Sequence, residues 1–219
     1  LSQGFAFRAG MFDIGQVEVL KGPQALFFGK NNTAGVISLR GADPTDEFEL
    51  IARAGYEFEA DERFGELIVS GPVGSTLKAR LAARYSDEEG FFRNTANPLP
   101  NRGALAPKYR RISNTNQMIL RGTVLFDPSD SYNARLKVNF VDDRWNGTGG
   151  DSQLALCPDG TGGVPPLNIA FLAGSECKLD RYVQVGDLDP KAWPGVPNGG
   201  VPFLDSQQYF GSLEQNLDL

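Results

Sequence analysis

Histidine is absent from this sequence of 219 residues, and cysteine, methionine and tryptophan occur only twice each. Histidine is the commonest general base in enzymes and the commonest protein ligand of transition metals, so many kinds of active site are excluded. Three adjacent acids, Asp87 to Glu89, suit a solvated strand end better than a Ca²⁺ site. The sequence therefore predicts no enzyme, no catalytic residue, no metal site and no cofactor.

Long hydrophobic runs are also missing. No stretch of about 18 apolar residues occurs, which excludes a transmembrane helix but not a barrel strand, whose signal is only alternation. The chain opens at Leu1 without a basic or apolar leader pattern, so we expect a mature or internal piece of a polypeptide. The formal net charge is −6 and the estimated pI is about 4.8, so nothing indicates nucleic-acid binding.

Turn-forming residues, by contrast, are abundant. The chain contains 26 glycines and 14 prolines, while 41% of its residues are hydrophobic. This composition favours many turns and few long helices. The expected fold class is all-β.

The stretch from Met118 to Val141 has the clearest pattern, that of a β-hairpin. Alternate residues of both arms are apolar, the intervening ones are mostly polar, and Asp127 to Asp130 supplies the turn. The apolar series is bounded by Tyr132 and Phe140, which lie roughly 20 Å apart across a membrane at a strand tilt of about 40°. That separation is typical of the apolar band of an outer-membrane barrel, although a soluble sandwich shows the same alternation.

Two short strands are predicted near the start of the chain, at 16–20 and 36–40, and strands similar to those of the hairpin are predicted elsewhere. Phe48 to Tyr56 repeats the frame of two aromatic residues eight positions apart, and further strands are expected near 64–71, 77–85, 117–126 and 132–141, with a sixth beginning at Tyr209. Tight turns join some of them, whereas the loops 86–116 and 142–206 are long and polar. Turns that alternate with long loops are typical of outer-membrane barrels, with the turns in the periplasm and the loops outside.

One segment resembles a known family. The run VEVLKGPQALFFGKNNTAGVISLRGADP, from Val17 to Pro44, resembles the second half of the plug domain of TonB-dependent outer-membrane receptors. The matching positions are Val17, Glu18, Val19, Leu20, Lys21, Gly22, Pro23, Phe28, Gly29, Gly35, Val36 and Ile37. Lys21, Phe28 and Ala34 replace residues that are more frequent in the family. The segment VSGPVGSTLKARLAARYSDEEGF also resembles early barrel strands of these receptors.

The resemblance implies a fold and a division into domains. Residues 1–44 would be the C-terminal half of a plug domain, and residues 45–219 the N-terminal portion of a transmembrane antiparallel β-barrel. Every strand edge must be paired in a bilayer, so about six strands cannot close around a plug. The resemblance implies a barrel of about 22 strands, with the remainder after Leu219 and the box that recruits TonB before Leu1.

The resemblance also implies site residues. The apical loop of a plug faces the cargo, which assigns substrate binding to Phe27, Phe28, Lys30, Asn31 and Asn32; for the two phenylalanines, burial in the plug core is the alternative. The plug motif consists of Lys21, Gly22, Pro23, Gly29 and Gly35, whose glycines supply turns.

Charged residues on the polar face of the strands are expected to point into the barrel lumen. They are Arg80, Arg84, Arg121, Arg135 and Lys137. They would either attract an anionic ligand or bind the plug. Lys21 and Arg40 would pair with lumen acids such as Glu49 or Glu66, or remain ordinary solvated charges.

The two cysteines, Cys157 and Cys177, lie in a glycine- and proline-rich segment without the spacing of a metal site. In an oxidising compartment their simplest use is a disulfide, with two free thiols as the alternative.

Three functions follow from these patterns. The first is TonB-dependent active import of a scarce ligand, such as a ferric siderophore, by a protein of the bacterial outer membrane. Its partners would be TonB, outer-membrane lipid, the remainder of its own barrel and a small-molecule cargo. The second is a non-transporting outer-membrane protein for adhesion or glycan binding. The third, a soluble β-sandwich, leaves the two aromatic frames and the loop asymmetry as coincidences.

Overall fold

The computed structural model describes residues 11–24, 34–112, 114–147 and 178–218. The apical loop residues Phe27, Phe28, Lys30, Asn31 and Asn32, the motif residue Gly29, and both cysteines lie outside the described residues. In the part of the chain that is described, no helix is long and apolar enough to cross a bilayer.

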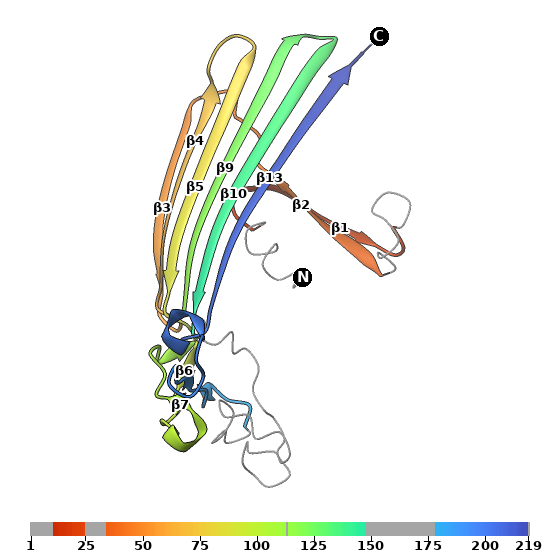
Figure 1. Ribbon diagram of the computed structural model, residues 1–219. Helices are drawn as coiled ribbons and strands as arrows, with labels where there is room; N and C mark the ends of the chain where they lie inside the picture. The colour runs from red at the N-terminus through yellow and green to blue at the C-terminus, as the bar shows by residue number, and fades with distance from the viewer. Residues whose placement is uncertain (1–10, 25–33, 113, 148–177, 219) are drawn as a thin grey trace.

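A two-stranded hairpin comes first. Strand β1 (Ile14–Lys21) pairs antiparallel with β2 (Gly35–Gly41), and the register runs from Lys21 opposite Gly35 to Ile14 opposite Gly41. The end of the hairpin near Gly41 approaches the main sheet, while the other end extends away from it (Figure 1). Both predicted strands, at 16–20 and 36–40, are confirmed and are slightly longer than expected.

The main sheet has six antiparallel strands in the order β13-β10-β9-β5-β4-β3. Its strands are β3 (Glu49–Glu57), β4 (Glu62–Pro72), β5 (Leu77–Glu88), β9 (Asn114–Ser129), β10 (Tyr132–Asn146) and β13 (Phe203–Leu217). The sheet is long, curved and open at both edges (Figure 1). All of the predicted strands are present.

The strands extend further than the alternation of apolar residues predicts. β5 continues through Glu88, β9 begins at Asn114, and β10 continues to Asn146. Hydrogen bonds between backbone groups form the ladder, so it continues where polar side chains have replaced the apolar series. The alternation therefore located the apolar part of each strand rather than its ends.

Both long loops lie at one end of the sheet, as predicted, and the short β3–β4 turn at 58–61 lies there with them. The β4–β5 and β9–β10 turns are at one end, and the loops between β5 and β9 and between β10 and β13 are at the other (Figure 1). These loops contain five short strands that the sequence did not predict. They are β6 (Phe92–Asn94), β7 (Ala104–Leu105), β8 (Arg111–Ile112), β11 (Tyr182–Val183) and β12 (Asp187–Leu188), with 3₁₀ turns at Pro100–Arg102 and Pro197–Gly200.

Candidate functional site: the two faces of the sheet and the segment docked on one of them

The outer face of the sheet is apolar across all six strands. In the ladder, Leu50 lies opposite Val69, Val69 opposite Leu81, Leu81 opposite Gly122, Gly122 opposite Val138, and Val138 opposite Gly211. Side chains in this row are exposed, with 60% of Leu81 and 49% of Val138 accessible. Directly opposite residues of neighbouring strands share a face, so the row forms one continuous apolar band.

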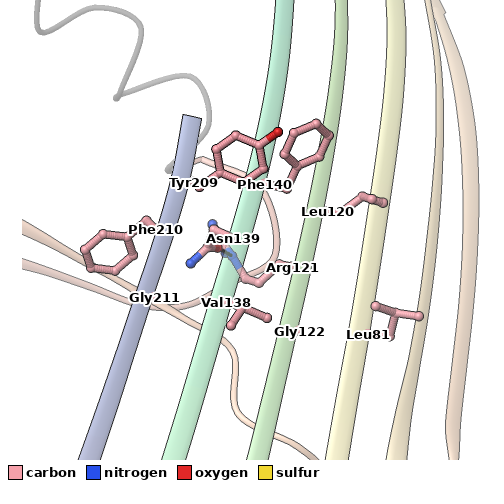
Figure 2. Close-up of a pocket in the computed structure, with 10 residues that line it drawn as sticks. All are labelled: Leu81, Leu120, Arg121, Gly122, Val138, Asn139, Phe140, Tyr209, Phe210 and Gly211. Atoms are coloured by element: carbon pink, nitrogen blue, oxygen red, sulfur yellow. Dashed lines mark hydrogen bonds between the residues drawn. The ribbon is translucent and has the colours of Figure 1, made fainter. Parts of the chain in front are cut away.

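Glycine leaves a shallow groove in this band. Val138 stands between Gly122 and Gly211, and the groove has a volume of about 460 Å³ (Figure 2). The rings of Phe140 and Tyr209 line one end of the groove, with their centroids 5.0 Å apart. The groove is an apolar surface feature and contains no arrangement of catalytic groups.

Aromatic residues also stand at the other end of the outer face. The rings of Phe126 and Tyr132 meet edge to face with centroids 6.4 Å apart. Tyr132 and Phe140 thus bound the apolar series of β10, as the sequence predicted. Bands of aromatic residues at both ends of an apolar face are typical of the two interfaces of a membrane barrel.

The inner face is mostly polar and carries one buried apolar cluster. Ile68, Ala82, Ile119 and Val141 lie side by side on four strands and pack against Phe12, which precedes β1. Phe12 is 5% exposed and Ile68 is 1% exposed. This contact explains why β4 is apolar on both of its faces: Leu67 and Val69 face outward, while Ile68 packs against Phe12.

Ionic contacts surround the buried phenylalanine. Arg80 of β5 donates to Asp13 through Nη2 at 2.6 Å and Nε at 3.0 Å, and through Nη1 to Glu49 of β3 at 3.0 Å. The side chains of Asp13 and Arg80 are 3% and 8% exposed. Asp13 has a positive φ of 50°, a region that aspartate tolerates better than most residues. Its backbone conformation therefore helps to aim the carboxylate at the sheet.

Arg121 of β9 forms a second anchor. Its Nη1 donates to the carbonyl oxygens of Phe12 at 2.5 Å and Asp13 at 3.1 Å, and its Nε donates to Asn139 of β10 at 2.6 Å. One guanidinium thus satisfies two backbone acceptors of the docked segment and one side chain of the sheet.

The end of β2 is held in the same way. Lys137 donates to the carbonyl of Gly41 at 2.9 Å and pairs with Asp43, also at 2.9 Å. Arg135 pairs with Asp43 at 3.0 Å and with Glu214 of β13 at 3.0 Å. Two residues after Asp43, the backbone N–H and the hydroxyl of Thr45 donate to Ser70 Oγ, which fixes the connection to β3.

Four of the five predicted lumen cations therefore contact residues 12–43: Arg80, Arg121, Arg135 and Lys137. Arg84 instead pairs with Glu62 and Glu66 of the neighbouring strand. The alternative pairing of Lys21 or Arg40 with Glu49 or Glu66 is wrong, because Glu49 pairs with Arg80 and Glu66 with Arg53 and Arg84. Glu66 lies one strand away from Arg53 and Arg84, and Glu49 lies two strands away from Arg80, which a linear sequence does not reveal.

The described residues of the plug motif form the turn end of the hairpin. Gly22 follows β1 with φ of 83° and donates its N–H to Ala34 at 3.2 Å. Gly35 has φ of 150°, and a Cβ there would lie 2.6 Å from the carbonyl oxygen of Leu20. Lys21 and Pro23 flank Gly22. The motif thus shapes this hairpin, and the ligand role of its apical loop stays a prediction.

The two long loops are joined into one folded unit, which we call the loop module: strands β6, β7, β8, β11 and β12 with their described connections. β11 pairs parallel with β6, and β12 pairs antiparallel with β7. Asn94 donates to the carbonyl of Val185 at 2.7 Å and accepts from its N–H at 3.2 Å. Ala104, Ile112 and Val183 are buried inside the module.

A buried carboxylate helps to join the two loops. Asp187 of β12 is 5% exposed and accepts the backbone N–H of Lys108 at 2.8 Å. Burial raises the pKa of Asp187 above its ordinary value of 3.8, and the Lys108 N–H only partly opposes this shift. The folded module therefore binds a proton more readily than the unfolded loop does.

This pKa shift has a stability consequence. Because the pKa is raised on folding, the loop module should become more stable as pH falls from neutral through the raised pKa toward 3.8. Asp187→Asn keeps the acceptor and removes the charge, so the module should be at least as stable at neutral pH and lose part of its acid response. Asp187→Ala should loosen it. Amide exchange of residues 92–96 and 182–188, measured against pH, checks this; an identical pH response in Asp187→Asn would contradict it.

Known structures provide an independent comparison. No protein-family model matches the chain. The ferripyoverdine receptor of the outer membrane of Pseudomonas aeruginosa, bound to ferripyoverdine, matches with a TM-score of 0.57 at 18% identity. The match covers 93% of this chain and 22% of the receptor. The chain has the fold of an outer-membrane receptor.

A second structure with this receptor fold, that of the FpvAI–pyocin S2 complex, matches with a TM-score of 0.56 at 19% identity. It covers 90% of this chain and 20% of the matched chain, so the chain spans about a fifth of the length of each neighbour. The predicted fold class, an all-β membrane-protein fold with about six antiparallel barrel strands, is confirmed, and the assignment of residues 1–44 to a plug domain stays a prediction. The sequence of residues 17–44 resembles receptors of this fold, and the structural comparison indicates the same fold.

Sequence reasoning missed the residues that dock the hairpin. Phe12 and Asp13 lie in a glycine-spaced stretch, MFDIG, whose pattern is too short to assign. A signal was present on the other side of the contact, since Ile68, Ile119 and Val141 interrupt the polar series of their strands. Apolar residues on a lumen face indicate that something covers them.

Proposed function

We propose that the chain is part of a TonB-dependent receptor that imports a scarce ligand, a ferric siderophore or a similar small molecule, across the bacterial outer membrane. Residues 1–44 would belong to the plug, and residues 45–219 would form part of a barrel wall of about 22 strands. The observation that carries the proposal is the pair of opposite faces: an apolar band faces outward, and a charged inner face holds Phe12 and Asp13.

The open edges of the sheet support a barrel wall. Among the described strands, β3 and β13 each pair on one side only. In hydrocarbon an unpaired strand edge leaves backbone groups without hydrogen bonds, so a wall of this kind needs further strands. The loop module would then lie outside the cell and the short turns in the periplasm.

The nature of the docked contact supports transport rather than a permanently sealed wall. One phenylalanine supplies the apolar contact, and the remaining contacts are ionic or polar. Polar contacts in a wet lumen exchange with water at modest net cost, so a pull from TonB on the plug could break them in sequence. Cargo would bind between the plug apex, including Phe27, Phe28, Lys30, Asn31 and Asn32, and the loops.

Uptake by living cells tests the proposal. We expect cells that express the full-length protein to accumulate its ferric siderophore, and accumulation to stop when TonB is deleted or the proton gradient is collapsed. Because the plug carries the coupling, deletion of residues 11–44 should also abolish energy-dependent accumulation while the barrel still reaches the outer membrane.

A matched control separates loss of coupling from loss of the protein. Glu66→Gln changes a carboxylate of the inner face that pairs with Arg53 and Arg84, and it should leave uptake unchanged. Surface binding that persists without uptake, with or without TonB, would overturn the transport proposal and favour an adhesion or glycan-binding protein.

A further inference from the structure

Each arginine that holds the Phe12–Asp13 segment divides its donors between that segment and the sheet. Arg80 uses Nε and Nη2 for Asp13 and Nη1 for Glu49. Arg121 uses Nη1 for the carbonyls of Phe12 and Asp13 and Nε for Asn139. Both anchors therefore have one partner that would leave with the plug and one that belongs to the wall.

The same division recurs where the hairpin joins the wall. Arg135 contacts Asp43 through Nη2 and Glu214 through Nη1, each at 3.0 Å. Glu214 belongs to β13, so it stays with the wall as Glu49 and Asn139 do. Arg80, Arg121 and Arg135 lie on three different strands, and each has one partner in residues 12–43 and another in the sheet.

We propose that Glu49 and Asn139 make the docking of the plug reversible by keeping Arg80 and Arg121 paired after the segment leaves. This inference rests on the proposed function. A guanidinium that loses every acceptor in a partly desolvated position is costly, an amide acceptor lowers this cost, and a carboxylate, which also balances the charge, lowers it further. The wall partners lower the free energy of the displaced state and hold each arginine in the orientation that the returning segment needs.

The proposal predicts the sign of two matched substitutions. Removing the plug partner, in Asp13→Asn, weakens the docked state, so the plug should be displaced more easily. Neutralising the wall partner, in Glu49→Gln, leaves the Arg80–Asp13 pair intact when docked but leaves Arg80 with only an uncharged amide acceptor when displaced, so the plug should be held more tightly. If Glu49 served only to position Arg80, both substitutions would loosen the plug.

Spin-label distances in the full-length receptor provide the test. Labels at Gln16 on β1 and Leu136 on the outer face of β10 would report the docked and displaced populations over a urea series, with Cys157 and Cys177 replaced by serine in every variant. Asp13→Asn should lower the docked-to-displaced ratio by about tenfold or more. Glu49→Gln should raise it by about threefold, and Asn139→Ala, which acts on Arg121, should raise it as well.

Control and contradicting outcomes are distinct. Glu66→Gln makes the same chemical change on the same face, between Arg53 and Arg84, and should leave the ratio unchanged within about twofold. A ratio that falls or does not move in both Glu49→Gln and Asn139→Ala would overturn the proposal. A receptor that docks its plug but imports nothing would overturn the proposed function, and the sign of the Glu49→Gln effect would still decide this inference.

Discussion

Leu81→Arg is expected to destabilise the full-length protein in lipid. Leu81 lies in the central row of the apolar outer face and is 60% exposed, so an arginine there would meet hydrocarbon. A charged residue near the bilayer midplane costs about 2–4 kcal/mol in a membrane barrel. The free energy of folding into lipid vesicles, measured by denaturant titration, should fall by that amount.

An arginine on the opposite face provides the control. Gln208 of β13 lies opposite Val141 on the inner face, so Gln208→Arg introduces the same side chain into the lumen. We expect the folding free energy to change by less than about 1 kcal/mol in this variant. Equal losses in both variants would show that the two faces meet the same solvent and would contradict a membrane wall.

Phe12→Ala is expected to release the docked Phe12–Asp13 segment from the sheet. Phe12 is buried against Ile68, Ala82, Ile119 and Val141, and truncation of a buried phenylalanine costs about 3–5 kcal/mol. The ionic contacts of Asp13 would then have to hold the segment without the apolar contact that Phe12 makes in this cluster. We expect single-channel conductance in planar bilayers to rise, with longer open events than in the unmodified receptor.

The neighbouring residue is a suitable control. Met11 is 58% exposed, so Met11→Ala removes a side chain of similar size without opening a cavity. It should leave conductance unchanged, and Phe12→Leu should lie between the two alanine variants. Closed channels in Phe12→Ala would show that the ionic contacts alone hold the segment in place.

The sequence predicted the six strands well because each has one face in contact with an apolar environment. Such a strand has an apolar residue at every second position of the sequence. It also predicted correctly that Arg80, Arg121, Arg135 and Lys137 face inward, since residue parity fixes the face. The partners of these cations were beyond reach, because Asp13 lies 67 residues before Arg80 and no periodicity relates them.

The loops were hardest to predict, for a physical reason. Strands β6, β7, β11 and β12 are two or three residues long, so none of them can show an alternating pattern. Their stability comes from pairing between segments about 90 residues apart, as in the reciprocal bonds of Asn94 and Val185. Local propensity contributes little to such contacts.

The parallel pairing of β6 with β11 constrains how the protein can be assembled and how it can diverge. Residues 92–94 can complete their pairing only after residues 182–183 have been synthesised, so the loop module forms late and depends on distant contacts. Exchange of one loop alone between relatives would remove residues that pack on Ala104 or Val183 and would expose these side chains. A change in one loop would therefore be tolerated mainly when the other loop changes with it.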